Sequence, residues 1–109
     1  MSKATIGLSE QHCGSRVSKL TDKEVHDLLQ SLAGWSLTDQ AIEKAFGFKN
    51  YYETMAFVNA VGWIAHREDH HPDLVVSYNK CVVRYSTHSV GGVSENDFIC
   101  AAKVETLSQ

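Results

Sequence analysis

The residues best suited to chemistry lie between His66 and His88, a stretch that holds four of the six histidines in the chain. The ordinary imidazole pKa of ~6.5 is the side-chain value nearest neutrality, so a histidine cluster can hold a proton donor beside a proton acceptor. A single histidine is more often a surface residue or a satisfied core residue. Several histidines on one rim would indicate general acid–base catalysis.

The spacing predicts that His70, His71 and His88 face one pocket. Pro72 ends the preceding helix and biases His71 toward an extended backbone. The residues that follow read as a β-hairpin, whose length returns His88 to the level at which the helix ends. His66 shares a face with His70 only if the helix reaches that far. The predicted hairpin comprises an outgoing strand 74–78, a turn at Asn79-Lys80 and a returning strand 81–87.

The first part of the chain supplies a helix and another hairpin. Thr21 and Glu24 form a capping box ahead of an apolar stripe, and Gly34 supplies a left-handed stop. Apolar and polar residues then alternate on either side of a short polar turn. The predicted elements are a helix over residues 22–33, strands over 35–37 and 42–48, and a turn over 38–40.

The next helix is predicted to be the central one, over residues 51–69. Asn50 caps it, and Glu53 completes an N-x-x-E variant of the capping box. Between residues 55 and 65 only Asn59 is polar, and one sheet face cannot cover a helix that is apolar nearly all round. A tightly wrapped monomer core is one solution. We favour burial of the spare face against a second copy of the chain.

The last helix completes an αββαββα order. Ser94 caps this helix, and Asp97 lies at its favourable N-terminal end. We therefore predict one α+β domain over residues 20–109, in which helices pack on one face of a four-stranded antiparallel sheet. Residues 1–19 lack periodicity and are predicted to be a mobile N-terminal lead-in.

Composition excludes several classes of partner. With 109 residues and a net charge of -3, the chain has no basic surface for nucleic acid or an anionic membrane. Cys13, Cys81 and Cys100 fit neither a disulfide framework nor a metal knuckle, and favour reduced thiols of an intracellular protein. The polar start shows no signal peptide or membrane span, so we expect a cytoplasmic location.

Four short motifs follow one another along the second half of the chain. They are Asp69-His70-His71-Pro72, Tyr78-Asn79-Lys80, Ser86-Thr87-His88 and Gly92-Val93-Ser94-x-x-Asp97. Together with the αββαββα order, they resemble the pterin-4a-carbinolamine dehydratase family from about Leu20 to the C-terminus. The resemblance implies a lyase that dehydrates 4a-hydroxytetrahydropterin to quinonoid dihydropterin, in the recycling of the tetrahydrobiopterin used by aromatic amino-acid hydroxylases. It also implies that no metal or organic cofactor takes part.

The resemblance implies roles for individual residues. His70, His71 and His88 match the three active-site histidines of the family. Family members are typically dimers or tetramers, which agrees with the spare face of the helix over residues 51–69 and with pairing of sheet edges. The substrate-binding positions implied are Asp69, Pro72, Ser86, Thr87, Ser89 and Asp97.

This chain departs from the family pattern at two positions. His66 stands where members often have an acidic residue, which removes a carboxylate that could orient or charge a catalytic imidazole. Leu74 stands where many members carry an aromatic residue, so stacking on the pterin ring is expected to differ there.

Two other functions compete with a dehydratase. His66, His70 and His88 would offer three nitrogens to zinc, but Arg67 and Asp69 stand where the helical zinc motifs need glutamate. The second alternative is a protein-binding module that acts as a dimerisation cofactor of a transcription factor through its apolar helix, as some family members do. The complete histidine set favours catalysis.

Overall fold

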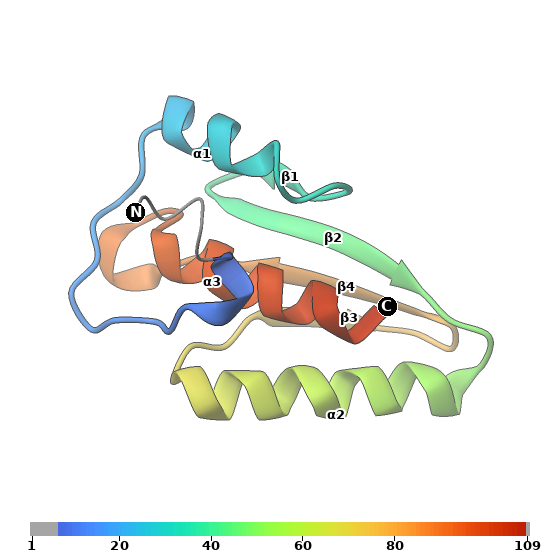
Figure 1. Cartoon of the computed structure of the whole chain (residues 1–109). Helices are drawn as coiled ribbons and strands as arrows, with labels where there is room; N and C mark the ends of the chain where they lie inside the picture. Colours follow the sequence, from blue (N-terminus) through green and yellow to red (C-terminus); the bar gives the residue numbers. More distant parts are fainter. Residues whose placement is uncertain (1–6, 109) are drawn as a thin grey trace.

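The computed structural model describes residues 7–108 of the 109-residue chain (Figure 1). Within these residues the helices and strands follow the predicted αββαββα order, which confirms the α+β class. Short 3-10 turns η2 (Leu8–Glu10), η3 (His88–Val90) and η4 (Thr106–Ser108) accompany them. The main elements are α1 (Asp22–Leu29), β1 (Ser36–Thr38), β2 (Ala41–Gly47), α2 (Tyr51–Glu68), β3 (Asp73–Val76), β4 (Lys80–Tyr85) and α3 (Glu95–Glu105).

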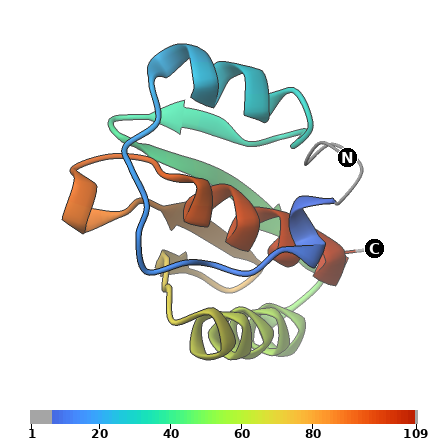
Figure 2. The ribbon, with the colours of Figure 1, turned by 60° about the vertical axis from the view of Figure 1, so that its left-hand side comes forward.

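The four strands form one antiparallel sheet in the order β1-β2-β4-β3. The strand β4 is central, with β2 on one side and β3 on the other, where Asp73 lies opposite Arg84. Side chains alternate along β4, so Cys81, Val83 and Tyr85 are fully buried beneath the helices. Figure 2 shows α1, α3 and α2 arranged over the same face of this sheet, as predicted.

The last helix, α3, supplies the centre of the core. Its Phe98, Cys100, Ala101 and Val104 have no exposed surface, and Val61 of α2 is equally buried. A helix enclosed in this way is rigid, because interiors packed like crystals leave side chains little room. The N-terminus of α3 is therefore a fixed point from which functional groups can be held.

The first helix is shorter than predicted. The capping box at Thr21 is present, but α1 ends at Leu29, four residues early. The backbone bonds that follow tighten to the three-residue pattern of a 3-10 turn, as from the Ser31 N–H to the Leu28 carbonyl at 3.1 Å. Gly34 then takes the left-handed conformation expected of it, with φ of 88°.

The hairpin between β1 and β2 turns at Asp39 and Gln40, inside the predicted turn. Both residues have positive φ, 49° and 67°. Two consecutive left-handed residues give a connection whose twist matches that of the paired strands. The turn brings this end of the hairpin close to the end of β4, because Arg84 donates to the Asp39 carbonyl at 3.0 Å.

The start of α2 differs in one detail from the predicted cap. Asn50 Oδ1 accepts from the Glu53 N–H at 2.9 Å, as expected. The Glu53 carboxylate, however, accepts from the Lys49 N–H at 3.0 Å, so the reciprocal bond goes to the residue before the cap. The helix ends at Glu68, one residue short of the prediction, because Asp69 adopts a left-handed backbone with φ of 51°.

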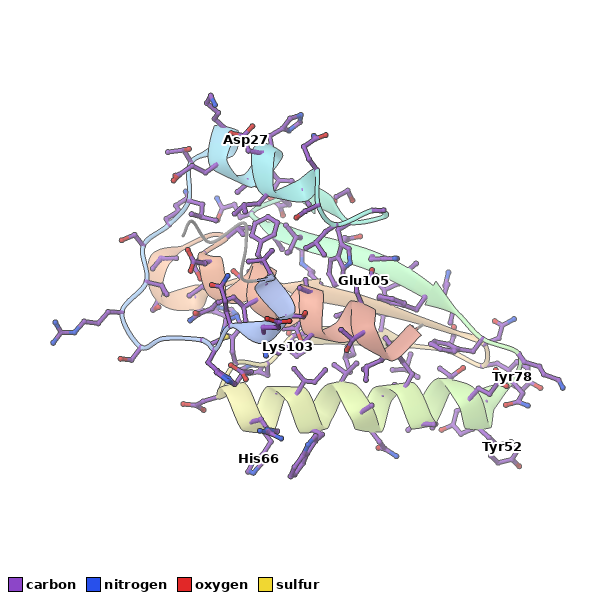
Figure 3. The ribbon with its side chains drawn as sticks, viewed as in Figure 1. Asp27, Tyr52, His66, Tyr78, Lys103 and Glu105 are labelled. Carbon is purple, nitrogen blue, oxygen red and sulfur yellow. The ribbon has the colours of Figure 1, made fainter. Side chains whose placement is uncertain are left out.

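The outer face of α2 is uncovered in the single chain. Phe57 and Val61 face the core, whereas Tyr52 is 82% exposed and Trp63 is 60% exposed. Figure 3 shows Tyr52 and His66 projecting from the side of the helix that faces away from the sheet. None of the helices in the described part of the chain is long and apolar enough to cross a membrane.

Residues 7–20 form an N-terminal strap that runs across α3, drawn in blue in Figure 2. Lys103 Nζ donates to the Ser9 carbonyl at 2.8 Å, and the Leu20 N–H donates to the Val93 carbonyl at 2.8 Å. Residues 1–6 lie outside the described residues. The mobility expected for residues 1–19 stays a prediction.

The buried carboxylate of Glu68 fastens the middle of the strap. Its side chain is 4% exposed and accepts from the Cys13 N–H at 2.8 Å and pairs with His12 Nδ1 at 2.9 Å. Lys103 Nζ lies 3.8 Å away. Burial by itself raises the pKa of Glu68, but the Cys13 N–H, the His12 ring and the Lys103 charge together hold that pKa below its ordinary value.

Replacing Glu68 with Gln is expected to lower the free energy of unfolding at neutral pH. The free energy of unfolding of the variant should also depend less on pH in acid. Because the folded-state pKa is lowered, the stability that ionised Glu68 contributes is fully present above the ordinary value of 4.5. It is lost as the pH falls through the folded-state value. Urea unfolding between about pH 3 and pH 7 measures this, since unfolding midpoints report the free energy directly when the slope is constant. Parallel curves for the two proteins would contradict the assignment.

Candidate active site

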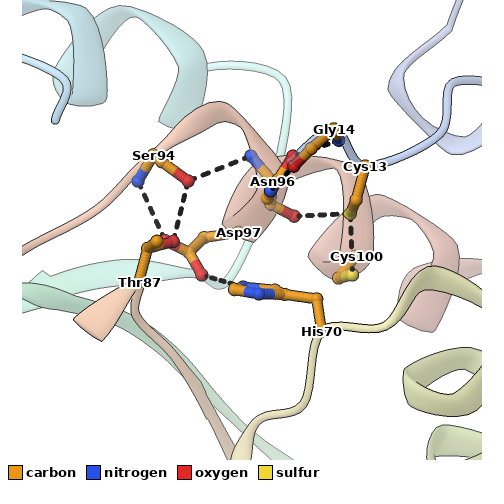
Figure 4. Close-up of polar contacts among 8 residues, drawn as sticks. All are labelled: Cys13, Gly14, His70, Thr87, Ser94, Asn96, Asp97 and Cys100. Carbon is orange, nitrogen blue, oxygen red and sulfur yellow. Dashed lines mark hydrogen bonds and ion pairs between the residues drawn. The ribbon is translucent and has the colours of Figure 1, made fainter. Parts of the chain in front are cut away.

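The His70 side chain is held by a fully buried carboxylate. Its Nε2 lies 2.6 Å from Oδ1 of Asp97, and the imidazole is 13% exposed while the carboxylate is not exposed at all (Figure 4). The ring also stacks on Tyr85, with centroids 5.9 Å apart and planes 12° from parallel. An ionised carboxylate only accepts hydrogen bonds, so this pairing assigns the proton to Nε2 of His70.

The second oxygen of Asp97 joins two further segments to the same point. Asp97 Oδ2 accepts from the Thr87 hydroxyl at 2.8 Å and from the Ser94 N–H at 2.9 Å. The Thr87 and Ser94 hydroxyls lie 2.7 Å apart. These bonds complete a capping box at the start of α3. The Asp97 carboxylate therefore links His70 in the loop after α2, Thr87 beyond the end of β4 and Ser94 at the start of α3.

His88 lies at an adjoining hollow of ≈ 200 Å³. It is exposed and begins η3, directly after the buried Thr87. Thr87 thus belongs both to the Asp97 network and to the wall of the hollow. The hollow is lined by Asp39, Gln40, Arg84, Ser86, Thr87, His88, Gly91 and Gly92.

The remaining predicted residues surround these two features. His71 is exposed in the loop before β3, Asp69 is exposed at the end of α2, and Pro72 is half-buried. Ser89 is exposed on η3. Since Asp73 pairs with Arg84, the antiparallel register carries residues 70–72 alongside residues 85–87. The hollow itself contains neither His70 nor His71, so a pocket shared by all three imidazoles stays a prediction.

Three contributions to this region were not assigned from the sequence. Tyr85 supplies the surface on which His70 stacks, and its inward direction follows from the alternation along β4. Ser94, expected only as a helix cap, also contacts Thr87. Arg84 lines the hollow and donates to Glu43 at 2.8 Å. Only the alternation of β4 carried a signal for any of them.

The Tyr85 hydroxyl is buried and has no hydrogen-bond partner. Among the described residues, it is the only buried side-chain polar atom of which this is true. Burial raises the pKa of Tyr85, and the neighbouring Cys100, Cys13 and Asp97 raise it further. This phenol therefore stays protonated and does not supply a base to the site.

The two departures from the family pattern lie at the edges of the region. The His66 ring packs on Trp63, with centroids 5.4 Å apart, on the outside of α2. Leu74 is half-buried and packs against the core. Across residues 7–108, no group of three or more His, Cys, Asp or Glu side chains is placed to hold a metal ion. The zinc ligand set of His66, His70 and His88 is therefore not assembled.

Comparison with known sequences gives one consistent result. The family model described as pterin 4 alpha carbinolamine dehydratase matches residues 18–107. A protein of Nitrosospira multiformis is 59% identical over 97 residues, covering 89% of this chain and 86% of that protein. A protein of Stenotrophomonas maltophilia is 54% identical over 109 residues, covering 95% and 94%. Both carry the provisional name pterin-4-alpha-carbinolamine dehydratase.

Two solved structures resemble the fold. A crystal structure titled as a transcriptional coactivator/pterin dehydratase of Brucella melitensis matches with a TM-score of 0.81 and 33% identity, covering 84% of this chain and all of that one. A pterin dehydratase-like protein identified as a RuBisCO assembly factor of the alpha-carboxysome matches with a TM-score of 0.56. Its identity is 21% over 68% of this chain and 86% of that one, so this second likeness concerns the fold alone.

Proposed function

The chain belongs to the pterin 4 alpha carbinolamine dehydratase family, and from that premise we propose that it dehydrates a 4a-hydroxytetrahydropterin to the quinonoid dihydropterin. The observation that carries the proposal is the His70–Asp97 pair, which is joined through Thr87 to the hollow that holds His88. A buried carboxylate on a largely buried imidazole is the arrangement by which a protein fixes the orientation and proton position of an acid–base group.

The proposed reaction needs one acid and one base. The bond between C4a and its hydroxyl breaks, and the hydroxyl leaves as water after taking a proton from the acid. The base removes the proton of the neighbouring ring N–H, whose electron pair forms the new carbon–nitrogen double bond. One proton is given and one is taken, so the enzyme returns to its starting charge. Positioned groups of this kind contribute ~10²–10⁴-fold.

The histidines are the residues that we assign to these roles. His70, His71 and His88 form the acid–base set, with His70 oriented by Asp97. Asp69, Pro72, Ser86, Thr87 and Ser89 surround them and contact the pterin. No metal or organic cofactor is required, because the ring nitrogen itself supplies the electrons that expel the hydroxyl.

The direct test follows the decay of a 4a-hydroxytetrahydropterin with and without the purified chain. Acceleration that persists in excess chelator is the expected result. No acceleration would overturn the proposed function. Activity that disappears in chelator and returns with one equivalent of metal would retain a dehydratase but overturn the metal-free mechanism.

We further propose that the chain is a homodimer or homotetramer, assembled through the outer face of α2 and the edges of the sheet. Trp63 on that face is 60% exposed, and the edge strand β3 carries Val75 at 66% exposure. A contiguous exposed apolar patch on a protein marks an interaction site, which supports an interface here. A cytoplasmic location and a functional link to an aromatic amino-acid hydroxylase, which would form the substrate, complete the proposal.

Replacing Trp63 with Glu is expected to shift the chain to monomer, because a charge without a partner is costly to bury in an interface. Light scattering at micromolar concentration measures the mass. The matched control is Gln30→Glu, which adds the same charge on the exposed end of α1 and should leave the mass unchanged. A wild-type chain that is already monomeric would remove the proposal.

A protein-binding module is the second candidate function. The structure from Brucella melitensis carries both names, transcriptional coactivator and pterin dehydratase. The uncovered aromatic face of α2 is the surface in this chain that a partner helix could contact. A purified chain without dehydratase activity, but with a protein partner whose binding is lost in Trp63→Glu, would reverse the order of the two candidates.

A further inference from the structure

Two thiols from opposite ends of the sequence meet behind the His70–Asp97 pair. Cys13 Sγ on the N-terminal strap lies 3.5 Å from Cys100 Sγ on α3, across 87 positions of sequence (Figure 4). Cys100 has no exposed surface, whereas Cys13 is half-buried at the edge of the strap. Cys13 is therefore the one of the two residues that a small oxidant in solvent can reach.

Contacts on both sides of Cys13 fix its position over α3. Its N–H donates to Glu68 Oε1 at 2.8 Å. The next residue is anchored twice, since the Gly14 N–H donates to Asn96 Oδ1 at 3.0 Å and Asn96 Nδ2 donates to the Gly14 carbonyl at 2.8 Å. The Cys13 thiol itself lies 3.6 Å from the Asn96 carbonyl. The sulfur contact is therefore held by the backbone on either side of it.

The geometry of the pair is suited to oxidation. A disulfide requires a sulfur–sulfur distance of ~2.05 Å, so the two sulfurs need to approach by about 1.5 Å. Cys13 is the more exposed of the two residues, so its thiol is the one that reacts first with an oxidant. The hydrogen bond with Cys13, together with burial, raises the pKa of Cys100, so Cys100 is not the thiol that starts the reaction.

We propose that Cys13 and Cys100 form an oxidative modification site, in which a peroxide converts the two thiols to an intramolecular disulfide. The Cys13 sulfur gives up its proton and attacks one peroxide oxygen, the O–O bond breaks, and the leaving hydroxide takes up that proton as the first water, so that Cys13 becomes a sulfenic acid. The Cys100 sulfur then attacks the Cys13 sulfur, and the thiol proton of Cys100 leaves with the sulfenic hydroxyl as the second water. Two thiols and one hydrogen peroxide thus give one disulfide and two waters.

The disulfide ties the strap to α3 covalently. It closes a loop that contains nearly the whole chain, and such a loop restricts the unfolded chain strongly. The reduced protein holds the strap by non-covalent contacts alone, and the oxidised protein adds a covalent bond that a thiol reductant can break. The site is independent of the proposed dehydratase activity, since it uses neither the histidines nor the hollow.

The test treats the full chain with hydrogen peroxide and then blocks free thiols before digestion. Trypsin, which cleaves after Lys and Arg, places the three cysteines in separate peptides, 4–16, 81–84 and 85–103. The expected result is a mass lower by two hydrogens and a linked pair of peptides 4–16 and 85–103, both reversed by dithiothreitol. The oxidised chain should also melt at least about 5 °C higher than the reduced one.

The matched control is Cys81→Ser, because Cys81 is buried in β4 and its thiol donates to the Val82 carbonyl, at 4.0 Å. This variant should form the crosslink as the wild type does. Cys13→Ser, at a half-buried position, should fold and lose both the crosslink and the rise in melting temperature. A linked peptide that contains Cys81, a crosslink between two chains, or Cys13 oxidised to sulfinic acid while Cys100 stays free would each overturn the proposal.

Discussion

Replacement of His88 by Gln is expected to slow dehydration of a 4a-hydroxytetrahydropterin by about 10²-fold, which corresponds to about 2.7 kcal/mol of activation barrier. The amide keeps a hydrogen-bonding side chain but cannot exchange a proton at neutral pH. His88 is exposed at the start of η3, so the change should leave the fold intact. Single-turnover rates with the unfolding midpoint measured alongside separate loss of chemistry from loss of structure.

His71→Gln is expected to have an effect of the same size, because His71 is also exposed and belongs to the proposed acid–base set. The matched control is His66→Gln. That ring lies on Trp63 on the outside of α2 (Figure 3), so it should change the rate far less. Near-normal turnover in both His71 and His88 variants would mean that these histidines are not the catalytic groups.

Replacement of Asp97 by Ala is expected to be strongly destabilising, at about 3 kcal/mol or more. Three donors would lose their acceptor inside the protein, namely His70 Nε2, the Thr87 hydroxyl and the Ser94 N–H. The first turn of α3 would also lose half of its capping box. Urea unfolding of wild type and variant measures the difference.

Two further variants give that measurement its controls. Asp97→Asn keeps the volume but points an amide NH₂ at groups that donate, so it should cost about 1–3 kcal/mol and slow turnover by disturbing His70. Asp27→Ala removes a carboxylate whose side chain is 68% exposed, and should stay within about 0.5 kcal/mol of wild type. A cost below about 1 kcal/mol for Asp97→Ala would show that the buried network is not what holds this region together.

Local chemistry explains which parts of the fold could be predicted. The capping box at Thr21, the left-handed Gly34 and the cap at Ser94 are decided by residues within one turn of each other. The early end of α1 could not be predicted, because its last bonds tighten to a 3-10 pattern without a Gly or Pro to mark the place. The partner of the Glu53 carboxylate could not be predicted either, because the N–H groups of Asn50 and Lys49 are both within its reach. In the structure the carboxylate accepts from Lys49.

The site shows the same division between local and distant determinants. The Pro72 motif and the length of the hairpin predict that His88 returns to the level at which the helix ends. In the structure, His70 and Thr87, the residue before His88, both contact the carboxylate of Asp97. That Asp97 would bind His70 depended on how α3 crosses the sheet, and no periodicity carries that information. The contact of Cys13 with Cys100 depends in turn on a strap whose only helical turn is the short η2, so its path is determined by its contacts with the rest of the protein.

The position of Asp97 in the chain has a consequence for how the protein is made. Synthesis proceeds from the N-terminus, so α3 leaves the ribosome after α1, α2 and the four strands. Until α3 forms, the imidazole of His70 lacks Asp97, and the N-terminal strap can bind Glu68 of α2 but none of its partners on α3. The proposed dehydratase activity is therefore expected to appear only once α3 has formed, and a nascent chain that ends before residue 105 should be inactive whatever else has folded.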